Sequence, residues 1–244
     1  LTVDSGTISV ANARALSATT SGTVTGTITS GTTIAAMVDG SSGLTETSNA
    51  YTITIASGDA EATAANITAL YGKTSVAVDA SAVTQITGTV DEANIVYAAG
   101  ASEITGLGNE AVVTTDTTLA DVTTLNTLDD NTTGTVNAGS ITSVTGTLAK
   151  LLTAYGSNGI TGLGNETIAV SDTVTLAASD LNSLDSKTSG TVTTSTSLAT
   201  LTGTVAALNT AYGSAGLSID GDEAITIADT TVDAGDLNIL NNLS

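Results

Sequence analysis

The residues best suited to chemistry in this sequence are carboxylates that recur at a nearly fixed interval. Asp116, Asp172 and Asp229 are spaced by 56 and 57 residues, and a series of glutamates has the same period. In a regular fold, equivalent carboxylates would line up, and aligned like charges need solvent or a bridging cation. Ca²⁺ prefers such hard oxygen ligands. The glutamates of this series are Glu110, Glu166 and Glu223.

The densest acidic cluster, IDGDE at Ile219–Glu223, predicts a Ca²⁺ site. Asp220, Asp222 and Glu223 would supply its carboxylate oxygens. The cluster has part of a calcium-binding loop but lacks the spacing of an EF-hand. The alternative is a solvated acidic turn, in which case the chain has no cofactor.

The composition argues against an enzyme. The 244 residues include no His and no Cys, which excludes a Ser-His-Asp triad, a Cys-His pair and a His/Cys zinc site. A pair of carboxylates can hydrolyse a glycosidic bond, but here every unit has the same carboxylates and no unique pair stands out. The absence of Trp and Phe also removes the aromatic platforms of most sugar clefts. We therefore predict no catalytic residues.

The charge balance excludes two kinds of partner. Four Lys and Arg against 24 Asp and Glu give a net charge of −20, which repels nucleic acid and anionic membrane surfaces. No apolar run approaches the ~18 residues of a membrane-spanning helix, so we expect no membrane insertion.

The elements that would position the carboxylates recur with the same period. TSGTV at Thr20–Val24 returns as TTGTV at Thr132–Val136 and TSGTV at Thr188–Val192, with a degenerate copy at Thr74–Val78. One unit is therefore about 56 residues long. A second series, TGTV or TGTL followed by a tyrosine, has the same period in a different phase. Its tyrosines are Tyr97, Tyr155 and Tyr212.

Each unit divides into two halves with the same order of elements. In the half at Glu166–Lys187, Ile168 and Val170 alternate as in a strand, while Leu181 and Leu184 have helical spacing. A half-unit of about 28 residues cannot bury its apolar face alone, so successive halves must stack.

The predicted fold class is a repeat solenoid. Its coils would be strand–turn–short helix segments of about 28 residues, stacked in units of about 56, which makes it a β-solenoid with helical segments. An array of separate β-sandwich domains is the competing architecture. We expect one continuous array over 1–244, forming part of a longer one, with the units 17–70, 71–128, 129–184 and 185–240.

Other recurring residues have structural interpretations. The tyrosines would close the edge of the core or form contacts between chains. The glycines of GLGNE, at Gly106–Glu110 and Gly162–Glu166, are turn glycines. Asn126, Asn182 and Asn238 would form a hydrogen-bonded ladder, although the corresponding positions of the first two units hold other residues.

The repeats resemble those of a known class of proteins. Gly159–Val192, followed by Thr200–Leu217, is similar to the repeats of giant acidic, Thr/Ala/Gly-rich cell-surface proteins of marine cyanobacteria, some of them linked to swimming motility. The resemblance covers essentially the whole chain and implies an extracellular or cell-surface location. It supplies no catalytic residues.

These observations predict a structural extracellular protein that forms part of a fibre, filament or surface layer. Its partner would be a further copy of itself, associated end to end or laterally. The alternative is the stalk of a secreted adhesin, rigidified by Ca²⁺. Threonine-rich runs such as Thr191–Ser197 leave ice binding as a third hypothesis, but the placement of threonine varies between units.

Overall fold

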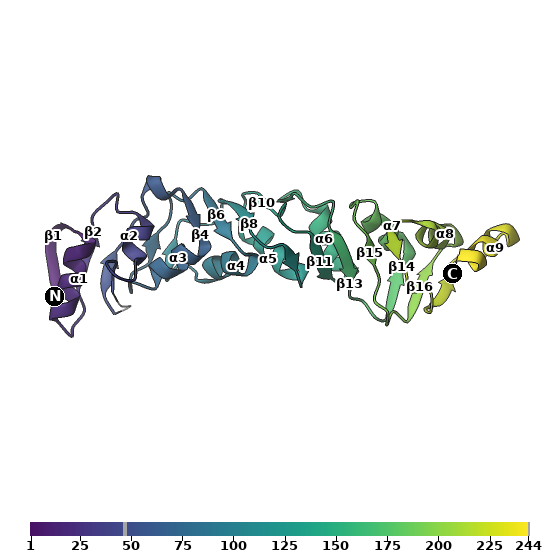
Figure 1. Ribbon diagram of the computed structural model, residues 1–244, viewed down its shortest axis with the longest axis horizontal. Helices are drawn as coiled ribbons and strands as arrows, with labels where there is room; N and C mark the ends of the chain where they lie inside the picture. Colours follow the sequence, from purple (N-terminus) through teal and green to yellow (C-terminus); the bar gives the residue numbers. More distant parts are fainter. Residues whose placement is uncertain (46–47, 244) are drawn as a thin grey trace. The chain divides into compact units, whose positions relative to one another are not determined.

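The computed structural model describes residues 1–45 and 48–243, which form a mixed α/β fold of short parallel strands and helices (Figure 1). The chain divides into two compact units. The first consists of Leu1–Thr115 and Thr127–Asn137, and the second of Asp116–Asn126 and the residues from Ala138 onward.

The strands of the first unit pair in parallel. One sheet has the order β1 (Thr2–Ile8), β2 (Thr25–Ile28), β3 (Ala50–Thr52). Another has the order β4 (Glu61–Thr63), β6 (Gln85–Gly88), β8 (Ala111–Thr114), β10 (Val136–Asn137). β5 (Val78–Asp79) pairs with β7 (Ile104–Thr105). The helices are α1 (Val10–Thr19), α2 (Ile34–Val38), α3 (Ala64–Tyr71) and α4 (Val90–Ala98), with a 3₁₀ turn, η1, at Ser57–Asp59.

The core of the first unit is a layer of aliphatic side chains between strands and helices. Ile86 in β6 pairs with Val112 in β8, which in turn pairs with Val136 in β10, and all three are fully buried. Ile67 of α3 and Val96 of α4 are also fully buried. Burying such a side chain stabilises the fold by roughly 2 kcal/mol.

The second unit is built in the same way. One sheet has the order β9 (Thr118–Leu119), β11 (Ser143–Gly146), β13 (Thr167–Val170), β15 (Val192–Thr193), β17 (Leu217–Ser218). The other has the order β14 (Thr175–Ala177), β16 (Thr200–Gly203), β18 (Ala224–Ile227). β12 (Ile160–Thr161) also belongs to this unit. The helices are α6 (Leu148–Gly156), α7 (Ala178–Asp185), α8 (Val205–Gly213) and α9 (Ala234–Leu243), and α5 (Val122–Asn131) begins in the second unit and ends in the first.

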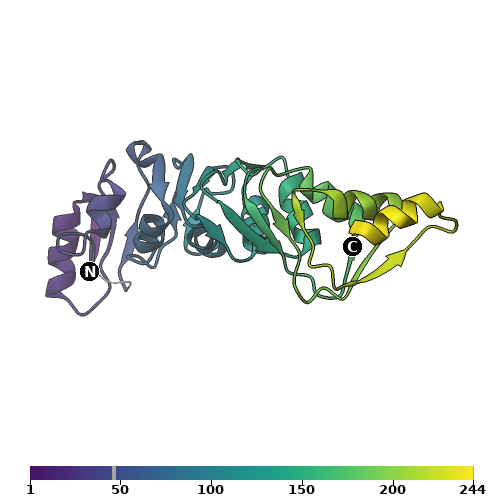
Figure 2. The ribbon, with the colours of Figure 1, turned by 45° about the vertical axis from the view of Figure 1, so that its right-hand side comes forward.

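Neighbouring helices of the second unit lie side by side, as α8 and α9 do in Figure 2. Leu181 of α7 and Leu208 of α8 are fully buried. On the strand side, Val144 pairs with Ile168 and Ile168 with Val192, in a buried aliphatic row. The strand expected at Ile168 and Val170 and the helix expected at Leu181 and Leu184 are therefore confirmed as β13 and α7.

The predicted β-solenoid of tandem coils is wrong. We expected a single stack of 28-residue coils, each with a turn or two of helix. The described residues instead form a mixed α/β fold of several separate parallel sheets with nine α-helices, and the chain divides into two units. The physical reason is that parallel strands cannot be joined by a tight turn and need a crossover, usually helical. The Ala/Leu/Asn stretches supply whole helices of up to ten residues for this purpose.

The sequence predicts no membrane-spanning helix. Among residues 1–45 and 48–243, no helix combines the length and apolarity that crossing a bilayer requires.

Candidate functional site

The recurring glutamates are buried rather than aligned at the surface. Glu110 and Glu166 are fully buried, and Glu223 is 8% exposed. Each follows a turn that contains glycine in the left-handed region, with φ of 126° at Gly108 and 135° at Gly164. Because residues that carry a side chain rarely adopt such a φ, the GLGNE motif needs glycine at these positions.

The same turn supplies a hydrogen bond to each carboxylate. The Gly108 N–H donates to Glu110 Oε2 at 2.8 Å, and the Gly164 N–H donates to Glu166 Oε2 at 2.8 Å. The Gly221 N–H donates to Glu223 Oε2 at 3.1 Å. A glutamate two residues after a left-handed glycine therefore folds back onto the turn that precedes it.

A tyrosine hydroxyl is the second donor to each carboxylate. Tyr97 donates to Glu110 Oε2 at 3.0 Å, and Tyr155 to Glu166 Oε2 at 2.7 Å. Tyr212 makes the same bond to Glu223. Burial, together with the neighbouring carboxylate, raises the pKa of all three tyrosines above its ordinary value. We call each hydrogen-bonded pair of a tyrosine hydroxyl and a glutamate carboxylate a Tyr–Glu lock.

The sequence contained a signal for these locks that was missed. The tyrosine and glutamate series run at a nearly constant separation, with the partners 11 positions apart in the second and third locks and 13 in the first. The tyrosines lie in the last turns of α4, α6 and α8 and are half-buried. This near-constant separation in sequence between tyrosine and glutamate is the signal that points to their pairing.

The Thr-x-Gly part of the TSGTV-like motifs holds the backbone of two of the glutamates. The Thr132 hydroxyl donates to the Glu110 carbonyl at 2.7 Å and accepts the Gly134 N–H at 3.0 Å. The Thr188 hydroxyl donates to the Glu166 carbonyl at 3.1 Å and accepts the Gly190 N–H at 3.0 Å. A Cβ atom at Gly134 or Gly190 would collide with that carbonyl, so the motif requires glycine.

Two of the recurring aspartates cap helices. Asp172 Oδ2 accepts the Leu148 N–H at the start of α6 at 2.7 Å, and Asp229 Oδ2 accepts the Val205 N–H at the start of α8 at 2.7 Å. A carboxylate at a helix N-terminus satisfies a free donor and favours the helix dipole. These two carboxylates therefore serve as helix caps.

The residues predicted to bind Ca²⁺ lie in different surroundings. Asp220 and Asp222 are exposed, whereas Glu223 is buried and directed toward Tyr212 and Gly221. Within the described chain, no three acidic side chains are grouped as a metal ion would need. Ca²⁺ binding by Asp220, Asp222 and Glu223 stays a prediction, and Glu223 would have to leave its lock to take part.

The asparagine series connects neighbouring helices. Asn126 Nδ2 donates to the Lys150 carbonyl at 3.0 Å, and Asn182 Nδ2 donates to the Ala207 carbonyl at 2.9 Å. Asn209, outside the predicted series, makes the equivalent bond to the Asp236 carbonyl at 3.1 Å, whereas Asn238 is exposed. The Oδ1 atoms of Asn126, Asn182 and Asn209 are buried without a hydrogen-bond partner.

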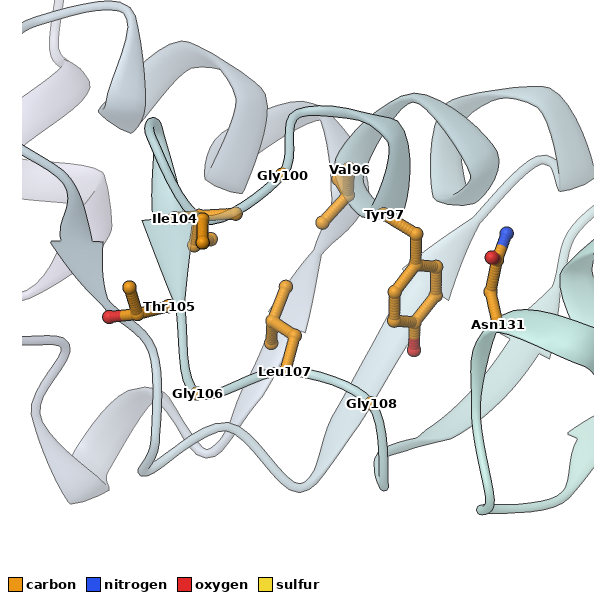
Figure 3. Close-up of a pocket in the computed structure, with 10 residues that line it drawn as sticks. Val96, Tyr97, Gly100, Ile104, Thr105, Gly106, Leu107, Gly108 and Asn131 are labelled. Atoms are coloured by element: carbon orange, nitrogen blue, oxygen red, sulfur yellow. The ribbon is translucent and has the colours of Figure 1, made fainter.

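A pocket of about 330 Å³ lies beside the first Tyr–Glu lock. Figure 3 shows the Tyr97 ring between Leu107, on the glycine turn, and Asn131, at the end of α5, with Val96 and Ile104 nearby. Three of the residues that line the pocket are glycines, and each has a positive φ. They are Gly100, Gly106 and Gly108.

Comparisons with known proteins give no homologue. No protein family, curated protein or solved structure was found to match the chain. A functional assignment therefore depends on the geometry described above.

Proposed function

We propose that the chain is a structural protein, part of an extracellular fibre, filament or surface layer. The observation that carries this proposal is that the recurring polar side chains of the chain form hydrogen bonds within the fold. Glutamates close locks with tyrosines, aspartates cap helices, threonines hold turns and asparagines join helices. The residue types that could do chemistry thus serve mainly to hold successive segments together.

The surface supports the same proposal. With four basic and 24 acidic residues, the chain carries a charge that keeps its surface hydrated and resists nonspecific adsorption. The resemblance to the surface proteins of marine cyanobacteria supports an extracellular or cell-surface location. In this proposal the partner is a further copy of the chain, bound end to end or laterally.

Electron microscopy of the purified chain, with Ca²⁺ and with a chelator, tests the proposal. Filaments or ordered arrays in either condition would support a structural role. A requirement for Ca²⁺ would assign the acidic turns to assembly, and the double variant Asp220→Asn/Asp222→Asn should then assemble poorly. Single particles in both conditions, at all concentrations tried, would contradict self-assembly.

A further inference from the structure

The pocket beside Tyr97 depends on a local change in the loop after α4. Glu110 lies 13 positions after Tyr97 in the sequence, whereas Glu166 lies 11 positions after Tyr155 and Glu223 11 positions after Tyr212. Gly100 and Ala101, within this longer loop, line the pocket. A Cβ atom at Gly100 or Gly108 would meet no atom within 4 Å, so the space beside these glycines is open.

The lining of this pocket is apolar and carries no charged side chain. Leu107 and Tyr97, both half-buried, offer it an aliphatic side chain and an aromatic ring, whereas the side chains of Val96 and Ile104 are buried (Figure 3). Thr105 and Asn131 also line the pocket, but the Thr105 hydroxyl donates to the Val78 carbonyl and the Asn131 amide donates to Asn94 Oδ1, each at 3.3 Å. An occupant would therefore need an apolar body of modest size.

Three features add negative potential to this apolar surface. The Tyr97 hydroxyl donates to the buried Glu110 carboxylate, which enriches the ring in electron density. The pocket lies at the C-terminal end of α4, where helix carbonyls carry partial negative charge. The chain as a whole has a charge of −20. An aromatic face in such a field attracts a cation that is weakly hydrated.

We propose that this pocket binds an organic cation, an alkylated ammonium group that rests on the face of Tyr97. Its apolar substituents contact the exposed part of Leu107. The same chemistry is offered by a free quaternary ammonium compound and by a methylated lysine side chain of another protein. A second hollow, of about 300 Å³, lies at Tyr212, but hydroxyls of Thr191 and Ser218 line it, and we expect weaker binding there.

The first experiment compares two ligands of the same shape. Choline and its neutral carbon analogue, 3,3-dimethylbutan-1-ol, are titrated into the full chain at constant ionic strength, and the amide resonances of Gly100, Gly106 and Gly108 are followed by NMR. The proposal requires saturable shifts with choline and at least fivefold weaker binding of the alcohol, the size of a cation–π contribution near 1 kcal/mol. Equal affinities, or no shifts with choline, would overturn it.

A pair of variants localises the effect. Tyr97→Leu removes the aromatic face, and Tyr155→Leu removes the equivalent tyrosine beside the shorter loop, so each variant loses one Tyr–Glu lock. Choline affinity should fall about fivefold in Tyr97→Leu and stay unchanged in Tyr155→Leu. An equal loss in both would contradict a site at Tyr97, and if either variant unfolds, the comparison of choline with the alcohol on the unmodified chain still decides.

The two sources of the ligand are separated by a second titration. A peptide with one trimethylated lysine is compared with choline and with the same peptide carrying unmodified lysine. Tighter binding of the trimethylated peptide than of choline identifies a protein side chain as the ligand, and the reverse order identifies a small molecule. If the unmodified peptide binds as well as the trimethylated one, an alkylated ammonium is not what the pocket recognises.

Discussion

The Tyr–Glu lock of the first unit and that of Glu166 in the second use the same parts at different separations. Both place a fully buried carboxylate between a tyrosine hydroxyl and a left-handed glycine N–H. The Tyr155 bond is 2.7 Å long and the Tyr97 bond 3.0 Å, and only the first lock has the longer loop. Two extra residues thus change the surface beside the lock but leave its hydrogen bonds in place.

The largest expected effect comes from the glycines behind the two locks. Gly134→Ala and Gly190→Ala would each drive a Cβ atom into a glutamate carbonyl, and backbone cannot yield as a side chain can. Each should reduce the free energy of unfolding by about 3 kcal/mol, measured by urea denaturation. Gly156→Ala, at the end of α6 with no atom within 4 Å of its Cβ, is the control and should be neutral or slightly stabilising. Unchanged stability in Gly134→Ala would mean that the first lock is looser than the second.

Removal of a tyrosine hydroxyl should have the next largest effect. Tyr155→Phe and Tyr97→Phe each take one donor from a buried carboxylate, at a cost of about 2 kcal/mol of unfolding free energy. Because the Tyr155 bond is shorter, its loss should cost more than that of Tyr97. Urea denaturation measures both, with the exposed Val174→Ala as control. A larger loss for Tyr97→Phe would reverse the order of the two locks.

The helix-capping aspartates should contribute less. Asp172→Ala leaves the Leu148 N–H at the start of the nine-residue helix α6 without its acceptor and should cost about 1 kcal/mol. In the first unit, Asp59 caps the five-residue helix α2 through Ile34 at 2.9 Å, and Asp59→Ala should cost less. Thermal denaturation in Ca²⁺-free buffer compares them, with the exposed Asp220→Ala as control. Equal losses would show that helix length does not matter here.

The smallest effect is expected from alkaline pH. The folded chain raises the pKa of Tyr97 and Tyr155, chiefly because burial disfavours the phenolate and then because Glu110 and Glu166 oppose it. A raised pKa stabilises the folded state fully below the ordinary tyrosine pKa of about 10, and this stabilisation is lost as the pH rises further. Urea denaturation between pH 8 and 11 should show stability falling above pH 10. The slope should be shallower in Tyr155→Phe, and an unchanged slope would exclude Tyr155 as a source.

Local elements of this fold were predictable, but their assembly was not. Alternation at Ile168 and Val170 and helical spacing at Leu181 and Leu184 identified β13 and α7 correctly. The number of strands was predicted wrongly, because several strands are only two residues long. β10 and β15 are examples, and two residues are too few to show the alternation that identifies a strand. The predicted stack of tandem coils therefore missed the division into several parallel sheets.

The residue types of the candidate site were predicted, but their partners were not. The recurrence of Glu166 and Asp172 was visible, and aligned charge at the surface was the simplest interpretation. In the structure Glu166 accepts a hydrogen bond from Tyr155, and Asp172 accepts one from the first residue of α6. These donors come close to the carboxylates only once the chain has folded. A buried carboxylate satisfied by neutral donors has no signature in composition or charge.

The parallel pairing has a consequence for how the chain acquires its structure. Ile86 pairs with Val112 and Val144 with Ile168, so the paired residues are 26 and 24 positions apart in sequence. Topologies with such short separations lose little loop-closure entropy per contact and fold quickly for their size. Each strand can therefore meet its partner soon after the intervening helix has left the ribosome. Early pairing limits the time during which unpaired strand edges are open to aggregation.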